Sequence, residues 1–298
     1  MKVLVTGANG LLGQKLIKLL LSKQDVDIIA TSRGNCRIKE LGRAEYHSLD
    51  VTNKAEVVNL FSELNPEVVI HTAAMTQVDD CELNQEDCKI ANYEAVRNIV
   101  DGCRSINAHL VHLSTDFIFD GSEGPLTEDA IPKPVNFYGE TKLEAEKLIF
   151  ESGISWGIAR TVLVYGIVPG LSRSNIILWV KDSLENKKTI NVVDDQWRTP
   201  TLAEDLAQGC WLMAKSKATG VFNISGNDML TPYDMAQMVA EHFHLDNKYI
   251  KRANSTTFSQ PAKRPAKTGF IIEKAENELG YKPHSFKQGI EIIADQLQ

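Results

Sequence analysis

A phenol and an amine in the middle of the chain have the spacing of an acid-base pair. Tyr138 and Lys142 lie four residues apart in a stretch with a helical pattern, and Thr115 ends the apolar, strand-like run before it. Residues four apart share one helix face, and a neighbouring ammonium lowers the pKa of a phenol from about 10 because it favours the phenolate. Such a pair beside a hydroxyl is what reduction of a carbonyl group requires. The spacing alone also fits two residues on a solvated helix, so the position after the strand favours the chemistry.

The first thirteen residues have the pattern of a buried strand, a glycine turn and the start of a helix. The apolar run 3–5 leads into Gly7, Gly10 and Gly13, and apolar residues at helical spacing follow. The helix therefore begins at the glycines, where its unpaired N–H groups and positive dipole end can bind an anion. Glycine turns also serve packing, but the second strand-like run 27–31, one helix later, favours a dinucleotide cradle.

The second strand ends with a basic residue where a ribose-binding carboxylate is usual. Residues 30–33 read Ala-Thr-Ser-Arg, without an Asp or Glu to bind the ribose 2′-hydroxyl. Arg33 can pair with a 2′-phosphate. This favours NADPH as the cofactor and leaves NADH possible, because Arg33 could also point into solvent.

Strand and helix patterns alternate through the first half of the chain. We predict strands near residues 3–5, 26–31, 46–50, 67–71, 109–113 and 156–160, and later helices near 53–64, 85–106 and 136–151. Repeated βα units with right-handed crossovers form an α/β fold with a doubly wound parallel sheet, and ligands bind at the carboxyl ends of its strands. Residues 1–165 should form this dinucleotide-binding domain, with the sheet completed by later segments.

Beyond residue 165 the alternation weakens. Helices are predicted near 173–187, 202–215, 232–244, 273–280 and 285–297, with a strand at 221–224 and a polar segment at 253–268. This pattern is typical of a smaller lobe over the sheet, so residues 166–298 should be mainly a substrate-binding lobe.

Composition excludes several classes of partner. The chain has 298 residues, 43% hydrophobic and 24% charged, and a net charge of −7, which argues against nucleic-acid binding. Five cysteines without a Cys-x-x-Cys pair suit reduced thiols. No leader-like segment precedes the first strand, and no apolar run approaches the ~18 residues that span a bilayer. We expect a cytoplasmic protein that binds small molecules.

Other candidate residues favour structural roles. His109 and His112 fall within one predicted strand, and His242 and His244 late in a helix, without further metal ligands nearby. The adjacent pairs 79–80 and 194–195 are acidic and are predicted to be turn or surface groups. Among the tryptophans of the second half, only Trp197, which precedes Arg198, is predicted to contact a ligand.

Several longer motifs resemble the extended short-chain dehydrogenase/reductases, and within them the dTDP-4-dehydrorhamnose reductase family. They span nearly the whole chain and comprise the glycine turn, 49–51, 71–79, Asn92, 114–121, 138–142, 160–161, 195–201 and 264–266. The chain departs from the family at Leu163, where the reductases carry tryptophan, and at Lys267 and Thr268, which replace Asn-Ser. The resemblance implies a Rossmann fold that reduces a 4-keto sugar to its alcohol.

The resemblance also implies roles for individual residues. Asp50 and Val51 would hold the adenine, Lys142 the ribose hydroxyls and Thr115 the substrate carbonyl, while Tyr138 would be the acid. The predicted cofactor-binding residues are Gly7, Asn9, Gly10, Leu11, Leu12, Gly13, Arg33, Asp50, Val51, Ala73, Ala74, Met75, Thr76, Asn92, Tyr138 and Lys142. The predicted substrate-binding residues are Thr115, Asp116, Gln196, Trp197, Arg198 and Arg264, and the C-terminal lobe would hold the nucleotide.

Two other functions stay open at this point. A nucleotide-sugar epimerase or 4,6-dehydratase could use the same scaffold, but dehydratases carry Asp-Glu after the threonine and here Phe117 follows Asp116. A non-catalytic regulatory subunit is the other alternative, since the β subunit of methionine adenosyltransferase is similar to these reductases. Retention of Thr115, Tyr138 and Lys142 favours an enzyme, and a homodimer is possible.

Overall fold

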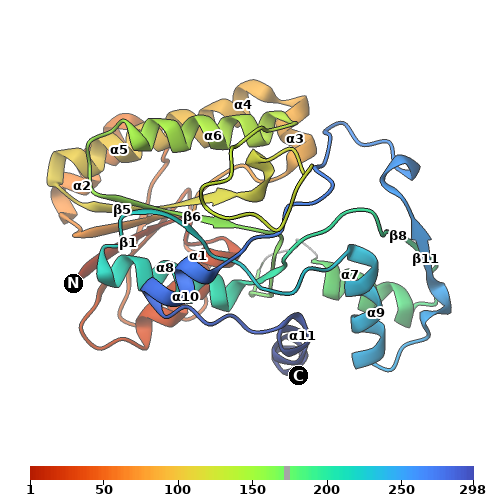
Figure 1. Cartoon of the computed structure of the whole chain (residues 1–298). Helices are drawn as coiled ribbons and strands as arrows, with labels where there is room; N and C mark the ends of the chain where they lie inside the picture. Colours follow the sequence, from red (N-terminus) through yellow and green to blue (C-terminus); the bar gives the residue numbers. More distant parts are fainter. Residues whose placement is uncertain (171–174) are drawn as a thin grey trace.

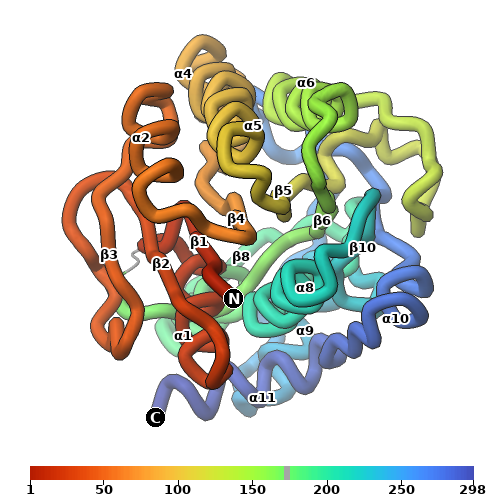
Figure 2. Tube along the Cα trace, turned by 90° about the vertical axis from the view of Figure 1, so that its left-hand side faces the viewer, coloured from red at the N-terminus to blue at the C-terminus, as the bar shows by residue number. Residues whose placement is uncertain are grey.

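A parallel sheet forms the centre of the molecule in the computed structural model, which describes residues 1–170 and 175–298. Within these residues the sheet has seven strands in the order β10-β6-β5-β4-β1-β2-β3, and all neighbours run parallel (Figure 2). The strands are β1 Lys2–Thr6, β2 Asp27–Ser32, β3 Glu45–Ser48, β4 Val68–His71, β5 His109–Thr115, β6 Trp156–Thr161 and β10 Gly220–Asn223. This confirms the doubly wound α/β fold, and β10 adds a strand from the second half of the chain.

Helices cover both faces of the sheet (Figure 1). One face carries α2 Lys54–Leu64, α5 Ala95–Ile106 and α6 Phe137–Phe150, and the other carries α1 Leu11–Leu21, α8 Ala203–Ser216 and α10 Glu273–Leu279. Coverage of both faces explains the continuous apolar runs, since Val3 to Val5 and Val68 to Ile70 are fully buried.

The strand order reverses beside β1, whose neighbours are β2 on one side and β4 on the other. Because every strand runs parallel, the carboxyl ends of β1, β2, β4 and β5 lie along one edge of the sheet. At such a reversal, the connections that follow the two neighbouring strands lead to opposite faces of the sheet, and a crevice forms between them. Proteins of this fold class bind their ligands in that crevice. Thr6, His71 and Thr115 end three of these strands.

A second group of elements packs around its own core. It contains α7 Ile176–Glu185, β8 Ile190–Val193, α9 Pro232–His242, β11 Ile250–Ala253 and α11 Phe286–Gln296, with β8 and β11 paired in parallel. Short strands β7 Val164–Tyr165 and β9 Thr201–Leu202 pair nearby. The helix predicted from residue 173 begins at Ile176, and its first two predicted positions lie outside the described residues. A division near residue 165 stays a prediction. No helix in the described part of the chain is long and apolar enough to cross a bilayer.

The single helix predicted over 85–106 is wrong in detail. The structure has α3 Val78–Leu83, α4 Gln85–Lys89, a π-helical turn at Ile90–Glu94 and then α5. The π turn carries Asn92, whose side chain is buried and bonded to the backbone of Met75. An apolar period does not distinguish a regular turn from a widened one, and π turns occur frequently at functional sites.

Candidate active site

Three glycines after β1 serve different purposes. Gly7 has a φ of +67°, and a Cβ there would lie 2.8 Å from the backbone nitrogen of Ala73. A Cβ on Gly13 would collide with the Gly7 carbonyl oxygen, so Gly13 is needed for packing. A Cβ on Gly10 would approach only that oxygen, at 3.1 Å, and Gly10 precedes α1 without a side-chain cap. The uncapped N–H groups of α1 and the open space over Gly10 fit a pyrophosphate.

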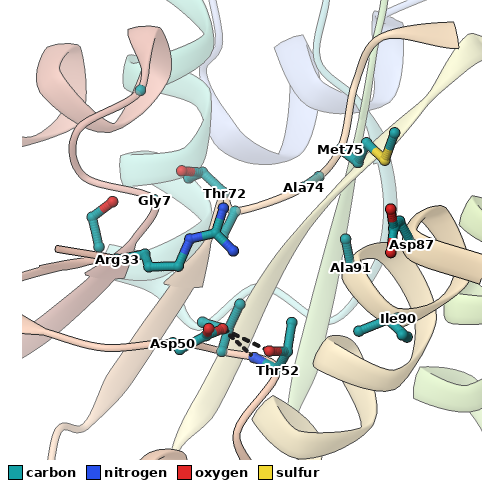
Figure 3. Close-up of a pocket in the computed structure, with 14 residues that line it drawn as sticks. Gly7, Arg33, Asp50, Thr52, Thr72, Ala74, Met75, Asp87, Ile90 and Ala91 are labelled. Carbon is teal, nitrogen blue, oxygen red and sulfur yellow. Dashed lines mark hydrogen bonds between the residues drawn. The ribbon is translucent and has the colours of Figure 1, made fainter. Parts of the chain in front are cut away.

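A pocket of about 690 Å³ lies over this turn at the strand ends (Figure 3). Eight of its lining residues were predicted, namely Gly7, Gly10, Arg33, Asp50, Val51, Ala73, Ala74 and Met75, and the others are Ser32, Thr52, Thr72, Asp87, Ile90 and Ala91. The unpredicted hydroxyl residues Ser32, Thr52 and Thr72 lie next to predicted ones in sequence, which could have revealed them. Asp87, Ile90 and Ala91 come from α4 and the π turn, which gave no local signal. The size and lining fit a nicotinamide dinucleotide.

Two of the predicted cofactor ligands, Asn9 and Asn92, are buried and use their side chains in hydrogen bonds within the protein. Asn9 accepts a hydrogen bond from the Arg37 backbone N–H at 2.8 Å and donates one to the Asn35 carbonyl at 2.9 Å. Asn92 bonds both the N–H and the carbonyl of Met75, at 2.8 and 3.0 Å. The predicted cofactor residues that are also absent from the pocket lining are Leu11, Leu12, Gly13, Thr76, Tyr138 and Lys142. Direct contact of these residues with a cofactor stays a prediction.

Arg33 and Asp50 place opposite charges at one end of the pocket. Figure 3 shows the Arg33 guanidinium extending between Thr72 and Asp50. Partial burial raises the pKa of Asp50, but hydrogen bonds from Thr52 at 2.7 and 3.0 Å and the charge of Arg33 outweigh it and leave the pKa below its ordinary value. Asp50 is therefore ionised at neutral pH. Arg33, the residue after the carboxyl end of β2, places a positive charge at the same end of the pocket.

The end of β5 and the start of α6 bring Thr115 and Tyr138 together. Thr115 Oγ1 accepts a hydrogen bond from the Phe117 N–H at 3.2 Å and donates one to Asp116 at 3.1 Å. Asn136 caps α6 by accepting from the Gly139 N–H at 2.9 Å. A Cβ on Gly139 would collide with the Phe117 carbonyl oxygen, so this glycine lets the helix start pack against the strand end.

The phenol of Tyr138 lies in an apolar environment. Tyr138 is only 8% exposed, packs with the thiols of Cys81 and Cys88, and meets the Phe117 ring edge-on at 5.8 Å between centroids. Burial raises the pKa of Tyr138 well above its ordinary value, and the neighbouring Thr115 side chain offsets only part of this rise. The predicted lowering of the Tyr138 pKa by Lys142 is therefore wrong for this structure, in which desolvation raises the pKa.

The Lys142 ammonium forms its hydrogen bonds with residues of β5. Its Nζ donates to the Leu113 carbonyl at 2.6 Å and lies 3.2 Å from His112 Nε2, and the residue is 3% exposed. Burial lowers the pKa of Lys142 to about 8, although the nearby Glu146 carboxylate opposes this shift. The ammonium thus remains the main form at neutral pH.

Asp116 and Arg198 form an internal anchor between the two parts of the site. Asp116 is 2% exposed, accepts a hydrogen bond from Thr268, and lies 3.7 Å from Arg198 Nε. Arg198 donates at 2.7 Å to the carbonyls of Trp197 and Pro265. These bonds fix the segment 265–268 against the end of β5, and direct contact of either residue with substrate stays a prediction.

A second pocket of about 210 Å³ lies in the C-terminal elements. Its lining includes the predicted Gln196 and Arg264, and also Trp179, Asn191, Val192, Val193, Pro232, Ser255, Phe258 and Gln260. Arg264 is held by Asp79 through two bonds of 2.5 and 2.7 Å, so the prediction of Asp79 as a turn or surface group missed this pairing. Trp197 is 39% exposed and bonds through its backbone to Ala266, outside this lining.

The histidines of β5 have partners other than metals. His109 Nδ1 lies 2.7 Å from Ser155 Oγ, and His112 contacts Lys142. Within residues 1–170 and 175–298, no three His, Cys, Asp or Glu side chains gather in a way that could hold a metal ion.

Comparisons with known proteins show what the chain is similar to. A family model described as RmlD substrate binding domain matches residues 1–298. The methionine adenosyltransferase 2 subunit beta of Rattus norvegicus is 31% identical over 255 residues, covering 84% of this chain and 74% of that protein. The dTDP-4-keto-6-deoxy-D-glucose reductase of Streptomyces niveus is 31% identical over 282 residues, covering 94% and 91%.

Solved structures share the whole architecture. A dTDP-4-dehydrorhamnose reductase ortholog from Clostridium acetobutylicum superposes with a TM-score of 0.87 at 29% identity, with 100% of both chains covered. The family model covers every residue, and the relatives share sequence along most of the chain. The chain therefore belongs to the RmlD substrate binding domain family.

Proposed function

We propose that this protein is an NAD(P)H-dependent reductase of a nucleotide-linked 4-keto sugar. The observation that carries the proposal is the contact between the Thr115 side chain and the buried Tyr138 phenol, with Lys142 one turn along the same helix. Met75, which packs with Tyr138, also lines the pocket over the glycine turn. The name of the Streptomyces niveus relative, a dTDP-4-keto-6-deoxy-D-glucose reductase, supports the same substrate class. A homodimer and a cytoplasmic location stay predictions.

The protein residues divide the work of carbonyl reduction. When bound, the reduced dinucleotide supplies a hydride for the carbonyl carbon. Tyr138 gives its phenolic proton to the carbonyl oxygen, and its raised pKa keeps that proton in place until the oxygen becomes basic. The Thr115 hydroxyl turns from Asp116 to donate a hydrogen bond to the same oxygen, and Lys142 would hold the ribose hydroxyls. The burial of all three residues excludes water from the reacting atoms.

The second pocket would hold the nucleotide part of the substrate. Trp179 and Phe258 are 37% and 38% exposed there, so both offer ring surface for a base. Arg264 adds a positive charge suited to a diphosphate. Its two hydrogen bonds to Asp79 fix the direction of the guanidinium.

The Asp79 carboxylate offers a test of this second pocket. We expect Asp79→Asn to raise KM for the nucleotide sugar roughly 10- to 100-fold, the loss of one charged hydrogen bond, with a smaller change in kcat. Steady-state kinetics measure both parameters. The matched control is Asp246→Asn, which removes an exposed pair with Lys248 and should leave KM unchanged. An unchanged KM in Asp79→Asn would show that Arg264 does not bind substrate.

Arg33 should set the cofactor preference. Because it brings a cation to the end of β2, we expect Arg33→Ala to weaken NADPH binding roughly 10-fold or more while NADH binding stays the same. Fluorescence titration of both reduced cofactors measures this difference. Arg104→Ala is the control, since Arg104 pairs with Asp101 on α5 and is outside the pocket lining. Equal or tighter binding of NADH by the unaltered protein would contradict the preference.

Two alternatives remain as outcomes of one experiment. Phe117 occupies the position where dehydratases carry a glutamate, and it packs against Tyr138. The rat relative is named as a methionine adenosyltransferase subunit, which keeps a regulatory role open. The test is a screen of dTDP-, UDP- and GDP-linked keto sugars that follows NADPH and NADH absorbance. Oxidation of the cofactor by one sugar supports the reductase, whereas tight cofactor binding, no turnover and a co-purifying protein partner support the regulatory function.

The identity of the sugar is the open part of the proposal. Leu163, which stands where the reductases carry tryptophan, is 42% exposed after β6. A leucine side chain has no ring that could pack against a sugar, whereas tryptophan does. The screen therefore includes keto sugars of more than one stereochemistry.

A further inference from the structure

Two buried histidines connect the glycine-turn side of the sheet with Lys142. His71 on β4 and His112 on β5 are register partners, and their rings stack at 5.5 Å with 19° between the planes. Each is 1% exposed. His71 Nδ1 lies 2.8 Å from Thr6 Oγ1 on β1, and His112 Nε2 lies 3.2 Å from Lys142 Nζ on α6. The row therefore crosses three strands below the pocket.

The partners of each ring determine its tautomer. An ammonium has donors and no acceptor, so His112 Nε2 accepts from Lys142 and the His112 proton is on Nδ1. Thr6 Oγ1 accepts from the N–H groups of Thr72 and Ala73, at 3.2 and 3.4 Å, so both of its lone pairs are used and its hydroxyl proton bonds His71 Nδ1. The His71 proton is then on Nε2. Burial lowers the pKa of His71 to about 3 and that of His112 well below its ordinary value, so both rings are neutral.

This arrangement leaves polar atoms unpaired. His71 Nε2 and His112 Nδ1 are buried without a hydrogen-bond partner in the described residues. A buried N–H without an acceptor destabilises the fold, so packing alone would favour an apolar side chain at these positions. The contact between His112 Nε2 and the Lys142 ammonium is the interaction that could offset the destabilisation from the unpaired N–H groups.

The other charged and titratable groups around Lys142 do not replace His112. Glu146, one turn further along α6, is fully buried and bonded to Arg160 of β6 at 3.0 and 2.7 Å. Cys88 of α4 acts on Lys142 through its charge, and its thiol bonds Asn92. In the described part of the chain, the hydrogen-bond acceptors of Lys142 Nζ are His112 Nε2 and the Leu113 carbonyl.

We propose that His112 is a positioning residue, whose Nε2 acts with the Leu113 carbonyl to hold the Lys142 ammonium charged and in place below the cofactor pocket. Stacking against His71, itself fixed by Thr6, keeps the His112 ring in the orientation that presents Nε2. The expected effect of His112 on turnover rests on the proposed reductase function. The expected effect of His112 on the charge and position of Lys142 is independent of that function.

The first measurement uses the unaltered protein. Histidine labelled with ¹⁵N distinguishes the two tautomers by NMR, and the proposal requires that His112 carry its proton on Nδ1 with a free Nε2 lone pair. His112→Gln identifies the resonance by its loss. A proton on Nε2 of His112 would overturn the proposal, because that nitrogen could not then accept from an ammonium.

The second measurement follows the charge of Lys142. In protein labelled with ¹³C at lysine Cε, the Lys142 signal, assigned through Lys142→Arg, reports its ionisation across pH. We expect His112→Leu to move this titration to lower pH, because the buried ammonium loses an acceptor while burial remains. His112→Gln, whose amide oxygen can accept, should restore most of the shift. The control His109→Leu removes a histidine of the same strand that bonds Ser155 instead, and it should leave Lys142 unchanged.

Turnover supplies a separate readout. With a substrate from the screen, His112→Leu should lower kcat by up to roughly 100-fold, and His112→Gln should recover much of it. An unchanged Lys142 titration in folded His112→Leu overturns the proposal, whatever the activity. If no keto sugar is reduced but the titration shifts, the proposed function fails and the positioning role stands. If His112→Leu does not fold, the tautomer of the unaltered protein decides.

Discussion

Replacing Tyr138 by phenylalanine is expected to lower kcat by roughly 10²- to 10⁴-fold while NADPH binding stays close to that of the unaltered protein. The substitution keeps the ring and removes only the hydroxyl. The ring packs among Cys81, Cys88 and Phe117, so the pocket wall stays filled. The proton that Tyr138 would give to the substrate oxygen is lost.

The buried position of Tyr138 explains why no other group should replace it. Thr115 can hydrogen-bond the substrate oxygen, but its aliphatic hydroxyl is too weak an acid to give up the proton. Its neighbour Asp116 is itself buried. Burial raises the pKa of Asp116, and its contacts with Arg198 and Thr268 offset only part of this rise. Both of its carboxyl oxygens are hydrogen-bonded, one to Thr115 and the other to Thr268. Stopped-flow or steady-state measurement of cofactor oxidation would report the loss.

Tyr281→Phe is the matched control. It removes a buried phenol that donates to the Ser225 carbonyl at 3.2 Å in the main core. Stability should fall slightly and kcat should not change. Lys142→Ala should behave differently from Tyr138→Phe and weaken both binding and turnover, because the ammonium is proposed to hold the ribose. A Tyr138→Phe protein with unaltered kcat would remove Tyr138 from the mechanism.

The sheet edge that carries the site could be predicted from local patterns. Buried parallel strands are short apolar runs, and glycines at the end of β1 mark the beginning of α1, so the order of strands and helices follows from the chain. Because parallel strands end at one edge, Gly10 and Arg33 could be placed around one pocket from the strand pattern, whereas Asp50 and Met75 were predicted through the resemblance to the reductases.

The residues that the sequence did not reveal depend on contacts between distant segments. Asp79 and Arg264 are separated by 185 positions, and nothing near Asp79 distinguishes it from an ordinary acidic helix start. Asn92 serves Met75 through a widened turn that an apolar period does not predict. Arg198 is a similar case. It was predicted to bind substrate, but its guanidinium donates hydrogen bonds to the backbone carbonyls of Trp197 and Pro265.

Electrostatics was the other limit of prediction. Four-residue spacing placed Tyr138 and Lys142 on one helix, but a pKa depends on burial and on the direction of each side chain. Tyr138 is desolvated by apolar neighbours, and Lys142 turns toward His112 and the Leu113 carbonyl. A ligand that reaches Lys142 would change its surroundings again. Burial and side-chain direction of this kind are properties of the folded structure and cannot be derived from the spacing of residues.

Gly10→Val is expected to abolish dinucleotide binding while the protein remains folded. A Cβ at Gly10 meets only the Gly7 carbonyl oxygen, at 3.1 Å, and the extended backbone there, with a φ of −79°, suits a β-branched residue. The two added methyl groups would occupy the space before the uncapped start of α1, where a pyrophosphate must approach the N–H groups. Fluorescence titration with NADPH should therefore detect no binding, and circular dichroism should match that of the unaltered protein.

Gly13→Ala is the matched contrast, three residues along the same turn. Its Cβ would collide with the Gly7 carbonyl oxygen and with Ala8, so the turn must shift. We expect a lower free energy of unfolding, by about 1–3 kcal/mol, as for overpacking of a close contact. The two substitutions should therefore have different effects. Gly10→Val removes dinucleotide binding from a stable protein, whereas Gly13→Ala lowers the stability of the fold. An insoluble or unfolded Gly10→Val protein would mean that Gly10 also serves packing, and the pyrophosphate cradle would lose its main support.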